Sequence, residues 1–157
     1  MSVKDKVIVL LHDVSSAQRL VDMARLVYGL GFSVFLVSKA YGGAATSGVP
    51  EVSRLALKLG KQFAVLPNVK EAVSLLEPEK VFIVSREHGE PTDPKSIADK
   101  VATSQGKVLL VFGGTESSPG KDVVGLGEPV YIVGTDSRIG AIGEAAIILY
   151  SLVLQHS

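Results

Sequence analysis

Short apolar runs alternate regularly with helix-forming segments along this chain of 157 residues. A continuously apolar run is typical of a parallel strand buried on both faces, because helices cover both faces of such a sheet. The sequence therefore predicts an α/β fold, with one domain over residues 1–157 and a parallel sheet covered by helices on both faces. The predicted strands are Val7–Leu11, Phe32–Ser38, Phe63–Leu66, Val81–Val84, Val108–Phe112 and Val130–Val133.

Helix start and stop residues lie between these runs at the expected places. Pro50 and Pro94 suit first helical turns, Asn68 suits an N-cap, and Gly60 suits a helix end. The segments 40–48 and 85–93 are rich in small or polar residues and are predicted to be loops. The predicted helices are Ala17–Leu30, Pro50–Leu59, Val69–Leu76, Pro94–Ser104 and a final one from about Ala141.

The composition narrows the classes of function. Lys+Arg and Asp+Glu number 16 each, which argues against a strongly basic nucleic-acid binder but is compatible with a local basic patch. There is no cysteine, which excludes disulfides and thiolate zinc sites, and three widely separated histidines give little support for a metal site, so we expect none. No apolar run reaches the roughly 18 residues of a membrane helix, and the N-terminal residues do not resemble a secretory signal. We therefore expect no membrane partner and a cytoplasmic location.

Two glycine-rich loops point to a binding pocket. The strand Val108–Phe112 runs into Gly113-Gly114-Thr115-Glu116, and the strand Val130–Val133 runs into a loop that begins at Gly134 and ends at Gly140. Half of the 16 glycines lie between residues 113 and 143. Glycine lets the backbone approach a ligand closely, and ligands of open α/β sheets bind outside the carboxyl ends of the strands. The pattern therefore predicts a pocket built largely from backbone.

Three segments, in this order, resemble the SPOUT class of RNA methyltransferases, in particular its small SpoU-like branch that methylates the ribose 2′-oxygen. Arg25–Phe32 is similar to the family's arginine-containing helix, which ends in Gly-Phe before the second strand. Val111–Glu116 is similar to its strand followed by Gly-x-Glu. Val130–Val133, a short loop and a helix that contains Ala-Ile-Ile-Leu-Tyr resemble its closing strand, loop and helix. The resemblance covers most of the chain.

The resemblance implies a C-terminal trefoil knot, a homodimer, S-adenosylmethionine as the cofactor and RNA, either tRNA or rRNA, as the substrate. By this resemblance the cofactor lies against backbone groups of both glycine loops. The cofactor-binding residues so implied are Phe112, Gly113, Gly114, Thr115, Glu116, Ile132, Val133, Gly134, Ile139, Gly140 and Ala145.

Three charged residues are candidates for catalysis of methyl transfer. Arg25 is predicted to lower the pKa of the acceptor hydroxyl or to bind a phosphate; alternatively it is a solvated helix residue paired with a carboxylate. Glu116 follows a buried strand and is predicted to form the pocket wall, or alternatively to cap a turn. Arg138 is predicted to contact phosphate or the acceptor, or alternatively to form a surface salt bridge.

The chain also departs from the family pattern, which keeps other functions open. Arg138-Ile139-Gly140 stands where the ribose-methylating branch has Ser-Leu-Asn, and Arg19 and Val21 replace its usual Asn and Gly. One alternative is a non-catalytic dimer of the same fold that binds RNA or protein. Another is an unrelated doubly wound protein that binds a nucleotide near Gly113, although the chain lacks both common glycine-rich phosphate-binding motifs.

Overall fold

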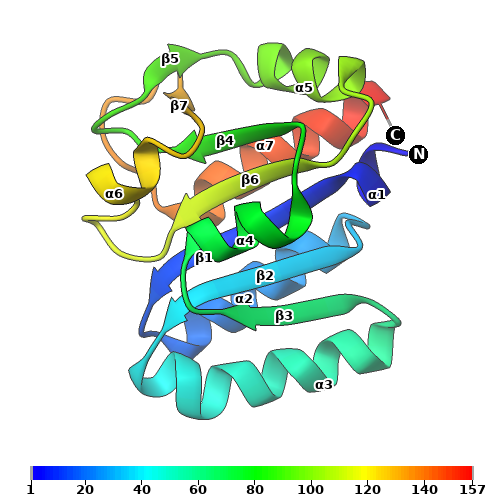
Figure 1. The fold of residues 1–157 in the computed structure, drawn as a ribbon, viewed down its shortest axis with the longest axis vertical. Helices are drawn as coiled ribbons and strands as arrows, with labels where there is room; N and C mark the ends of the chain where they lie inside the picture. Colours follow the sequence, from blue (N-terminus) through cyan, green and yellow to red (C-terminus); the bar gives the residue numbers. More distant parts are fainter. Residues whose placement is uncertain (1, 157) are drawn as a thin grey trace.

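The structure is a computed structural model that describes residues 2–156, and its strands form one seven-stranded sheet. The strand order is β3-β2-β1-β6-β4-β7-β5, and every neighbouring pair is parallel (Figure 1). The strands are β1 (Val7–Val14), β2 (Val34–Ala40), β3 (Gln62–Leu66), β4 (Lys80–Val84), β5 (Glu90–Thr92), β6 (Val108–Gly113) and β7 (Glu128–Ile132). The predicted α/β class is confirmed.

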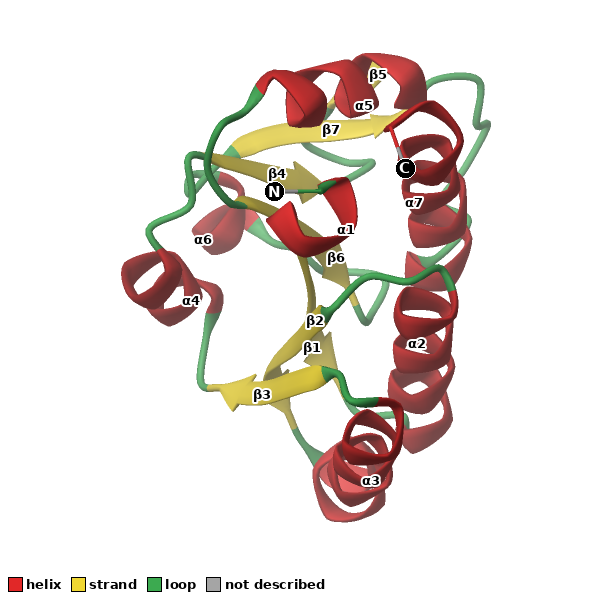
Figure 2. Ribbon diagram, turned by 90° about the vertical axis from the view of Figure 1, so that its right-hand side faces the viewer, coloured by secondary structure: helices red, strands yellow, loops and turns green. Residues whose placement is uncertain are grey.

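Helices cover both faces of the sheet, but unequally. Figure 2 shows α2 and α7 together on one face and the short helices α4 and α6 on the other. The α2–α7 face also receives α3 and α5 and buries the larger apolar core, whereas the α4–α6 face buries a smaller one. The helices are α1 (Val3–Lys6), α2 (Ala17–Gly29), α3 (Val49–Leu59), α4 (Val69–Leu76), α5 (Pro94–Thr103), α6 (Lys121–Val124) and α7 (Ala141–His156), and a π-helical turn η1 (Ala44–Gly48) precedes α3.

Alternation along the central strands assigns each side chain to one core. Val9 and Leu11 of β1 face the α2–α7 core, and Ile8 and Leu10 face the α4–α6 core. This alternation follows from the two-residue period of a strand. It places His12, the next even-numbered residue, on the α4–α6 face at the carboxyl end of β1.

Two predicted loops contain regular structure. The predicted loop 85–93 contains β5, a three-residue strand that pairs with β7 at the sheet edge. Pro91 fits there because an edge strand has no neighbour on one side that requires its missing N–H. The predicted loop 40–48 contains η1, which continues directly into α3. Its small residues carry no apolar period, so its helical form depends on packing against α2.

Two further predictions concern the trefoil knot and membrane-spanning helices. The trefoil knot remains a prediction. Among the described residues, no helix combines the length and the apolar character that crossing a membrane requires.

Candidate functional site

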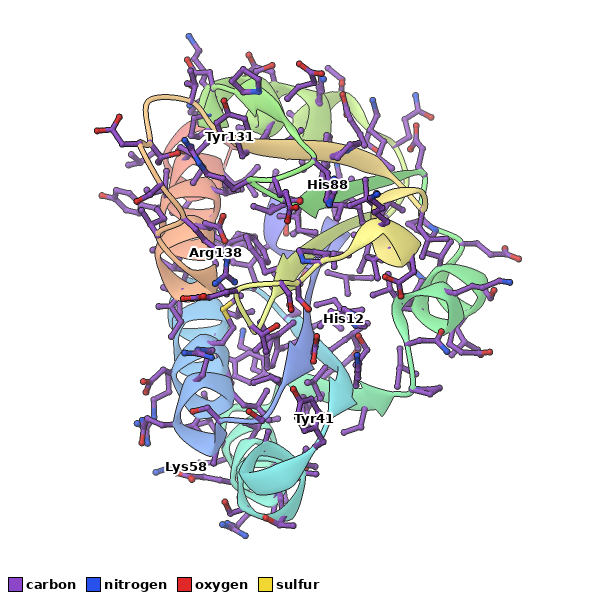
Figure 3. All side chains as sticks on the ribbon, turned by 90° about the vertical axis from the view of Figure 1, so that its left-hand side faces the viewer. His12, Tyr41, Lys58, His88, Tyr131 and Arg138 are labelled. Atoms are coloured by element: carbon purple, nitrogen blue, oxygen red, sulfur yellow. The ribbon has the colours of Figure 1, made fainter. Side chains whose placement is uncertain are left out.

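The carboxyl ends of the strands carry the polar side chains that form the candidate site, and Figure 3 looks onto this edge of the sheet. A hollow of about 170 Å³ lies there between the loops that follow β4, β6 and β7. We call it the loop pocket. Its lining residues are Ser85, Arg86, Glu87, Glu116, Ser117, Ser118, Pro119 and Arg138. Ligands of parallel sheets bind at this edge, so the pocket lies where the fold favours a site.

The loop after β6 turns so tightly that two consecutive glycines are required. A Cβ atom on Gly113 would lie 1.9 Å from the carbonyl oxygen of Ser118, and one on Gly114 would lie 2.5 Å from that of Asp13. The N–H of Gly114 donates to the carbonyl oxygen of His12 at 2.8 Å, which binds the loop to β1. These glycines serve close backbone packing within the protein.

Two arginines hold the carbonyl groups of these glycines. Arg138, from the loop before α7, donates to the Gly113 carbonyl oxygen at 2.9 Å. Arg19, from the first turn of α2, donates to the Gly114 carbonyl oxygen at 2.7 Å. Each guanidinium has five N–H donors, so both groups keep donors for a ligand. The arrangement gathers positive charge around the glycine loop.

Asp13 connects the loop pocket to the strands beneath it. Its carboxylate accepts a short hydrogen bond from the Ser118 hydroxyl and a longer one, 3.5 Å, from Thr115, and it lies 3.8 Å from the Lys39 ammonium. Burial raises the pKa of Asp13, but the Ser118 hydroxyl and the Lys39 charge outweigh it, so the pKa lies below its ordinary value. The carboxylate is therefore ionised at neutral pH.

Asp13 and Lys39, which form this ion pair, both have an unusual backbone conformation. Asp13 and Lys39 have φ values of 67° and 52°, in the left-handed region that side chains other than glycine rarely adopt. Such conformations cost about 1–3 kcal/mol each and cluster at functional sites. Their position at the carboxyl ends of adjacent strands supports a functional role for this edge.

Arg86 forms the opposite wall of the loop pocket. Its guanidinium lies 4.6 Å from the ring centre of Tyr131 and donates a short hydrogen bond to the Thr135 hydroxyl. Stacking on an aromatic ring restrains the planar guanidinium and leaves its remaining donors available. Arg86 and Arg138 therefore present two fixed cationic groups to one pocket.

The structure brings two of the three predicted catalytic residues together. Glu116 and Arg138 both line the loop pocket. Arg25 is exposed and lies 3.9 Å from Glu51 of α3, as in the salt-bridge alternative. It follows Arg19 by six residues on α2, a rise of about 9 Å away from the carboxyl edge. Within this chain Arg25 therefore does not join the pocket, and its catalytic role stays a prediction.

The predicted cofactor-binding residues fall into three groups. Phe112 and Ala145 are fully buried core residues, so only their backbone groups are available to a ligand, and Ile132 is also buried. Gly113, Gly114 and Thr115 form the tight loop described above. Val133, Gly134, Ile139 and Gly140 lie around the loop after β7, and Val133 and Ile139 are 51% and 45% exposed. Their cofactor role stays a prediction.

Several site residues were missed from the sequence. They are His12, Asp13, Lys39, Ser85, Arg86 and Ser118. Polar pairs that directly follow a buried strand, such as His12-Asp13 and Ser85-Arg86, are a signal that could have identified four of them. Among residues 2–156 no group of three or more His, Cys, Asp or Glu side chains is placed to hold a metal ion.

Comparisons of sequence point to a nuclease family. The family described as "RecB-family nuclease (DUF2122)" matches residues 42–151. The "Putative type II restriction enzyme ApeKORF2002P" of Aeropyrum pernix is 47% identical over 148 residues, which cover 94% of this chain and 93% of that protein. The "Putative type II restriction enzyme MjaORF1200P" of Methanocaldococcus jannaschii is 33% identical over 147 residues, which cover 94% and 96% of the two chains.

Comparisons of structure identify the fold. TrmJ from Z. mobilis superposes with a TM-score of 0.78 at 18% identity, covering 94% of this chain and 68% of that one. The SpoU methyltransferase AviRb from Streptomyces viridochromogenes, in complex with AdoMet, superposes with a TM-score of 0.71 at 19% identity, covering 96% and 58%. These likenesses show a SPOUT-like fold, as the resemblance implied, and one of the similar proteins binds S-adenosylmethionine.

The prediction of an S-adenosylmethionine-dependent RNA methyltransferase is wrong in the light of the family and its two relatives. The same findings correct the alternative prediction of a non-catalytic binding module, because the family is described as a nuclease family and both relatives are named as enzymes. The physical reason is that the three resembling segments encode strands, tight glycine turns and a helix, which specify a fold. A fold hosts unrelated activities, and activity resides in the side chains placed on it.

Proposed function

Because this chain belongs to the family described as RecB-family nuclease (DUF2122), we propose that it hydrolyses phosphodiester bonds of nucleic acid in the loop pocket. Its two relatives are each named a "Putative type II restriction enzyme", and these names favour duplex DNA as the substrate. The observation that carries the proposal is the convergence of Arg86 and Arg138 on one pocket that also contains carboxylates.

The two arginines bind the scissile phosphate in this proposal. Planar guanidinium groups match the geometry of phosphate oxygens and form charge-assisted, often bidentate, hydrogen bonds with them. Arg86 is restrained by Tyr131 and Thr135, and Arg138 by the Gly113 carbonyl group. The restraint lowers the entropy lost on binding and leaves the charge to stabilise the negative transition state.

Glu116 is the proposed general base. Its side chain is exposed and lines the same pocket. The carboxylate accepts a proton from water while the water oxygen bonds to phosphorus, the bond from phosphorus to the leaving sugar oxygen breaks, and that oxygen takes a proton from solvent. Glu87 also lines the pocket, and one or two carboxylates together with substrate phosphate oxygens suit Mg²⁺.

The first test is cleavage of supercoiled plasmid DNA, with and without Mg²⁺, and of a bulk RNA under the same conditions. We expect cleavage by the wild-type chain and a loss of about tenfold or more in Arg86→Ala and Glu116→Gln. Lys58→Ala, an exposed lysine on α3, is the matched control and should cleave normally. Absence of cleavage by pure, folded wild-type protein on both nucleic acids would contradict the proposal, as would equal activity of all variants.

S-adenosylmethionine is a second candidate ligand, favoured by the AviRb complex with AdoMet. Two features of the loop after β7 fit it. A Cβ atom on Gly134 or Gly140 would meet nothing within 4 Å, so space is open beside both. Val133 and Ile139 are exposed and offer apolar surface to an adenine ring. Gly113 is packed against Ser118 and Gly114 against Asp13, so this segment offers no such space.

Calorimetry with S-adenosylmethionine tests this candidate separately from cleavage. We expect micromolar binding that Ile139→Asp weakens by about tenfold, because a charge replaces apolar surface. Leu59→Asp on α3 exchanges an apolar residue that is 48% exposed, close to the 45% of Ile139, and is the control. Binding that is absent, or that Ile139→Asp leaves unchanged, removes S-adenosylmethionine from this loop.

We also propose that two copies of the chain associate through α7. Ile147, Tyr150 and Leu154 lie three and four residues apart, on one face of this helix, and all three are exposed. A row of large apolar side chains that none of the described residues of its own chain covers is typical of a subunit interface.

A further inference from the structure

A second hollow lies on the α4–α6 face of the sheet and shares no lining residue with the loop pocket. Its volume is about 260 Å³. Figure 3 shows His12 toward α4, whereas Arg138 lies beside α7. We call this hollow the His12 pocket. It is lined by His12, Asn68, Val69, Lys70, Asp122, Val123 and Leu126.

His12 directs a hydrogen-bond donor into this pocket. The residue is 6% exposed, and its Nδ1 lies 2.8 Å from the Oγ of Ser38, which is fully buried. A buried hydroxyl group needs a hydrogen-bond acceptor. Within residues 2–156, the only hydrogen-bond partner of the Ser38 hydroxyl is Nδ1 of His12. Ser38 therefore donates to Nδ1, which places the ring proton on Nε2. This Nε2–H has no partner among the described residues.

The charge of the imidazole agrees with this tautomer. Burial lowers the pKa of His12, although Asp13 and Asp122 act in the opposite direction. The ring is therefore neutral at pH 7 and carries one proton. A neutral ring with a fixed Nε2–H is a donor for an anionic oxygen and needs no counter-ion of its own.

The N-terminus of α4 supplies further donors. The Asn68 side chain accepts from the N–H of Glu71 at 2.8 Å and so satisfies one of the first helical N–H groups. The backbone N–H groups of Val69 and Lys70 have no acceptor in the part of the chain that the structure describes. The exposed Lys70 side chain lines the same hollow. Helix N-termini favour anions, and here the donor groups meet a lysine and the His12 Nε2–H.

Asp122 adds a negatively charged hydrogen-bond acceptor to a pocket whose other polar groups are mainly donors. It lies in the first turn of α6 and lines the hollow beside Val123 and Leu126. A carboxylate accepts hydrogen bonds and repels a bare anion. A ligand that fits all the lining groups therefore carries an oxyanion for His12, Lys70 and α4, and a hydroxyl group for Asp122.

We infer that the His12 pocket binds a ribose phosphate, with the phosphate at His12, Lys70 and the α4 N-terminus and a sugar hydroxyl at Asp122. The ligand is either a free sugar phosphate or one nucleotide unit of an RNA strand, and both share this chemistry. The site goes beyond the proposed hydrolysis, because it shares no lining residue with the loop pocket and requires no catalysis.

The test is an NMR titration that follows the ring nitrogens of His12 in the full chain. Ribose 5-phosphate, inorganic phosphate and a short single-stranded RNA are the probes. We expect the Nε2 resonance of His12 to shift with ribose 5-phosphate, with a Kd on the order of 1 mM. Lys70→Ala should weaken binding about tenfold, whereas Lys58→Ala should not. Asp122→Asn should reduce the preference for ribose 5-phosphate over inorganic phosphate.

Each outcome has a defined meaning. A tighter response to RNA than to ribose 5-phosphate assigns the pocket to a nucleic-acid strand, and the reverse assigns it to a free sugar phosphate. Unmoved His12 resonances with all three probes, or equal affinity for inorganic phosphate and ribose 5-phosphate, overturn the inference. Because Lys70 and Asp122 are exposed, their variants keep the fold, and failure here is distinct from loss of plasmid cleavage.

Discussion

Gly113 illustrates how a single residue can specify the loop that forms the candidate site. It ends β6 with no room for a side chain, since a Cβ atom would lie 1.9 Å from a backbone oxygen. Backbone atoms cannot move aside as the end of a flexible side chain can. The glycine therefore serves the close approach of two segments five residues apart.

We expect Gly113→Ala to lower the free energy of unfolding by about 2 kcal/mol or more, because the loop must shift to admit a methyl group. Urea denaturation measures this change. Gly125→Ala is the matched control, because a Cβ atom there would meet nothing within 4 Å and φ is −68°. Equal stability of the two variants would contradict this prediction, because it would show that the loop accommodates a methyl group without loss of free energy of unfolding.

A second prediction for a single residue concerns the contribution of the Asp13 charge to stability. Its pKa in the folded chain lies below the ordinary value of 3.8, so its contribution to stability is present above that pH and is lost as the pH falls through the folded pKa. Asn fits the left-handed backbone, so Asp13→Asn removes the charge alone. We expect the variant to be less stable by about 1 kcal/mol at pH 7.

Urea unfolding of both proteins between pH 7 and pH 3 checks this prediction. The stability difference should shrink below pH 3.8 as the wild-type carboxylate becomes protonated. A difference that stays constant across this range would indicate that Asp13 acts through packing and not through its charge.

Helix α7 buries a carboxyl group in its first turn, which opposes the ionisation of that group. It runs against α2 and α5, and its first turn buries Glu144 to 5% exposure. Burial raises the pKa of Glu144 from 4.5 to about 7, and the nearby Arg138 charge only partly opposes this. A carboxyl group with a raised pKa contributes stability at low pH, and that contribution is lost as the pH rises through 7.

We therefore expect Glu144→Gln to stabilise the chain at pH 8.5 by an amount on the order of 3 kcal/mol, because the amide has no charge to bury. At pH 4.5 or below the two proteins should differ by less than about 1 kcal/mol. Thermal unfolding at both pH values measures the effect. A variant that is equally destabilised at both would mean that the ionised carboxylate is paired with Arg138.

At the scale of the whole molecule, the exposed apolar face of α7 predicts a dimer. The wild-type chain should sediment at twice 16.5 kDa, and Tyr150→Glu should sediment as a single chain, because it places a charge in the middle of the apolar face. Lys58→Glu changes an exposed residue on α3 and should leave the mass unchanged. A wild-type monomer at micromolar concentration would contradict the proposed interface.

The sequence predicted much of the sheet because buried parallel strands are continuous apolar runs. The predicted β4 and β6 differ from the structure by one residue at one end, whereas β1 extends past the polar His12 and Asp13 to Val14, which pairs with Ala40 of β2. The strand β5 escaped prediction because three residues that include a proline carry no pattern of their own. Its formation depends on β7, which lies about 40 residues further along the chain.

The candidate site was predicted in part. Glu116 and Arg138 were identified because each lies in a glycine-rich loop after a strand, and the structure places both in one pocket. Arg86 was not identified because the start of its loop is not rich in glycine. Its role depends on contact with Tyr131, and this contact arises from the pairing of β4 with β7. The functional assignment failed because the resembling segments describe turns and strands and not the chemistry of the pocket.

The sequence by itself determined the alternation of strands and helices and the position of the glycine loops at the carboxyl ends of strands. Both depend on residues close together in the chain, through apolar periodicity and the conformational freedom of glycine. The tertiary structure alone decided that Asp13 meets Ser118, that Arg86 faces Arg138 and that His12 opens into a separate pocket. These contacts follow from the strand order, which is set by the packing of the whole sheet between two helical layers and is not encoded in any local pattern.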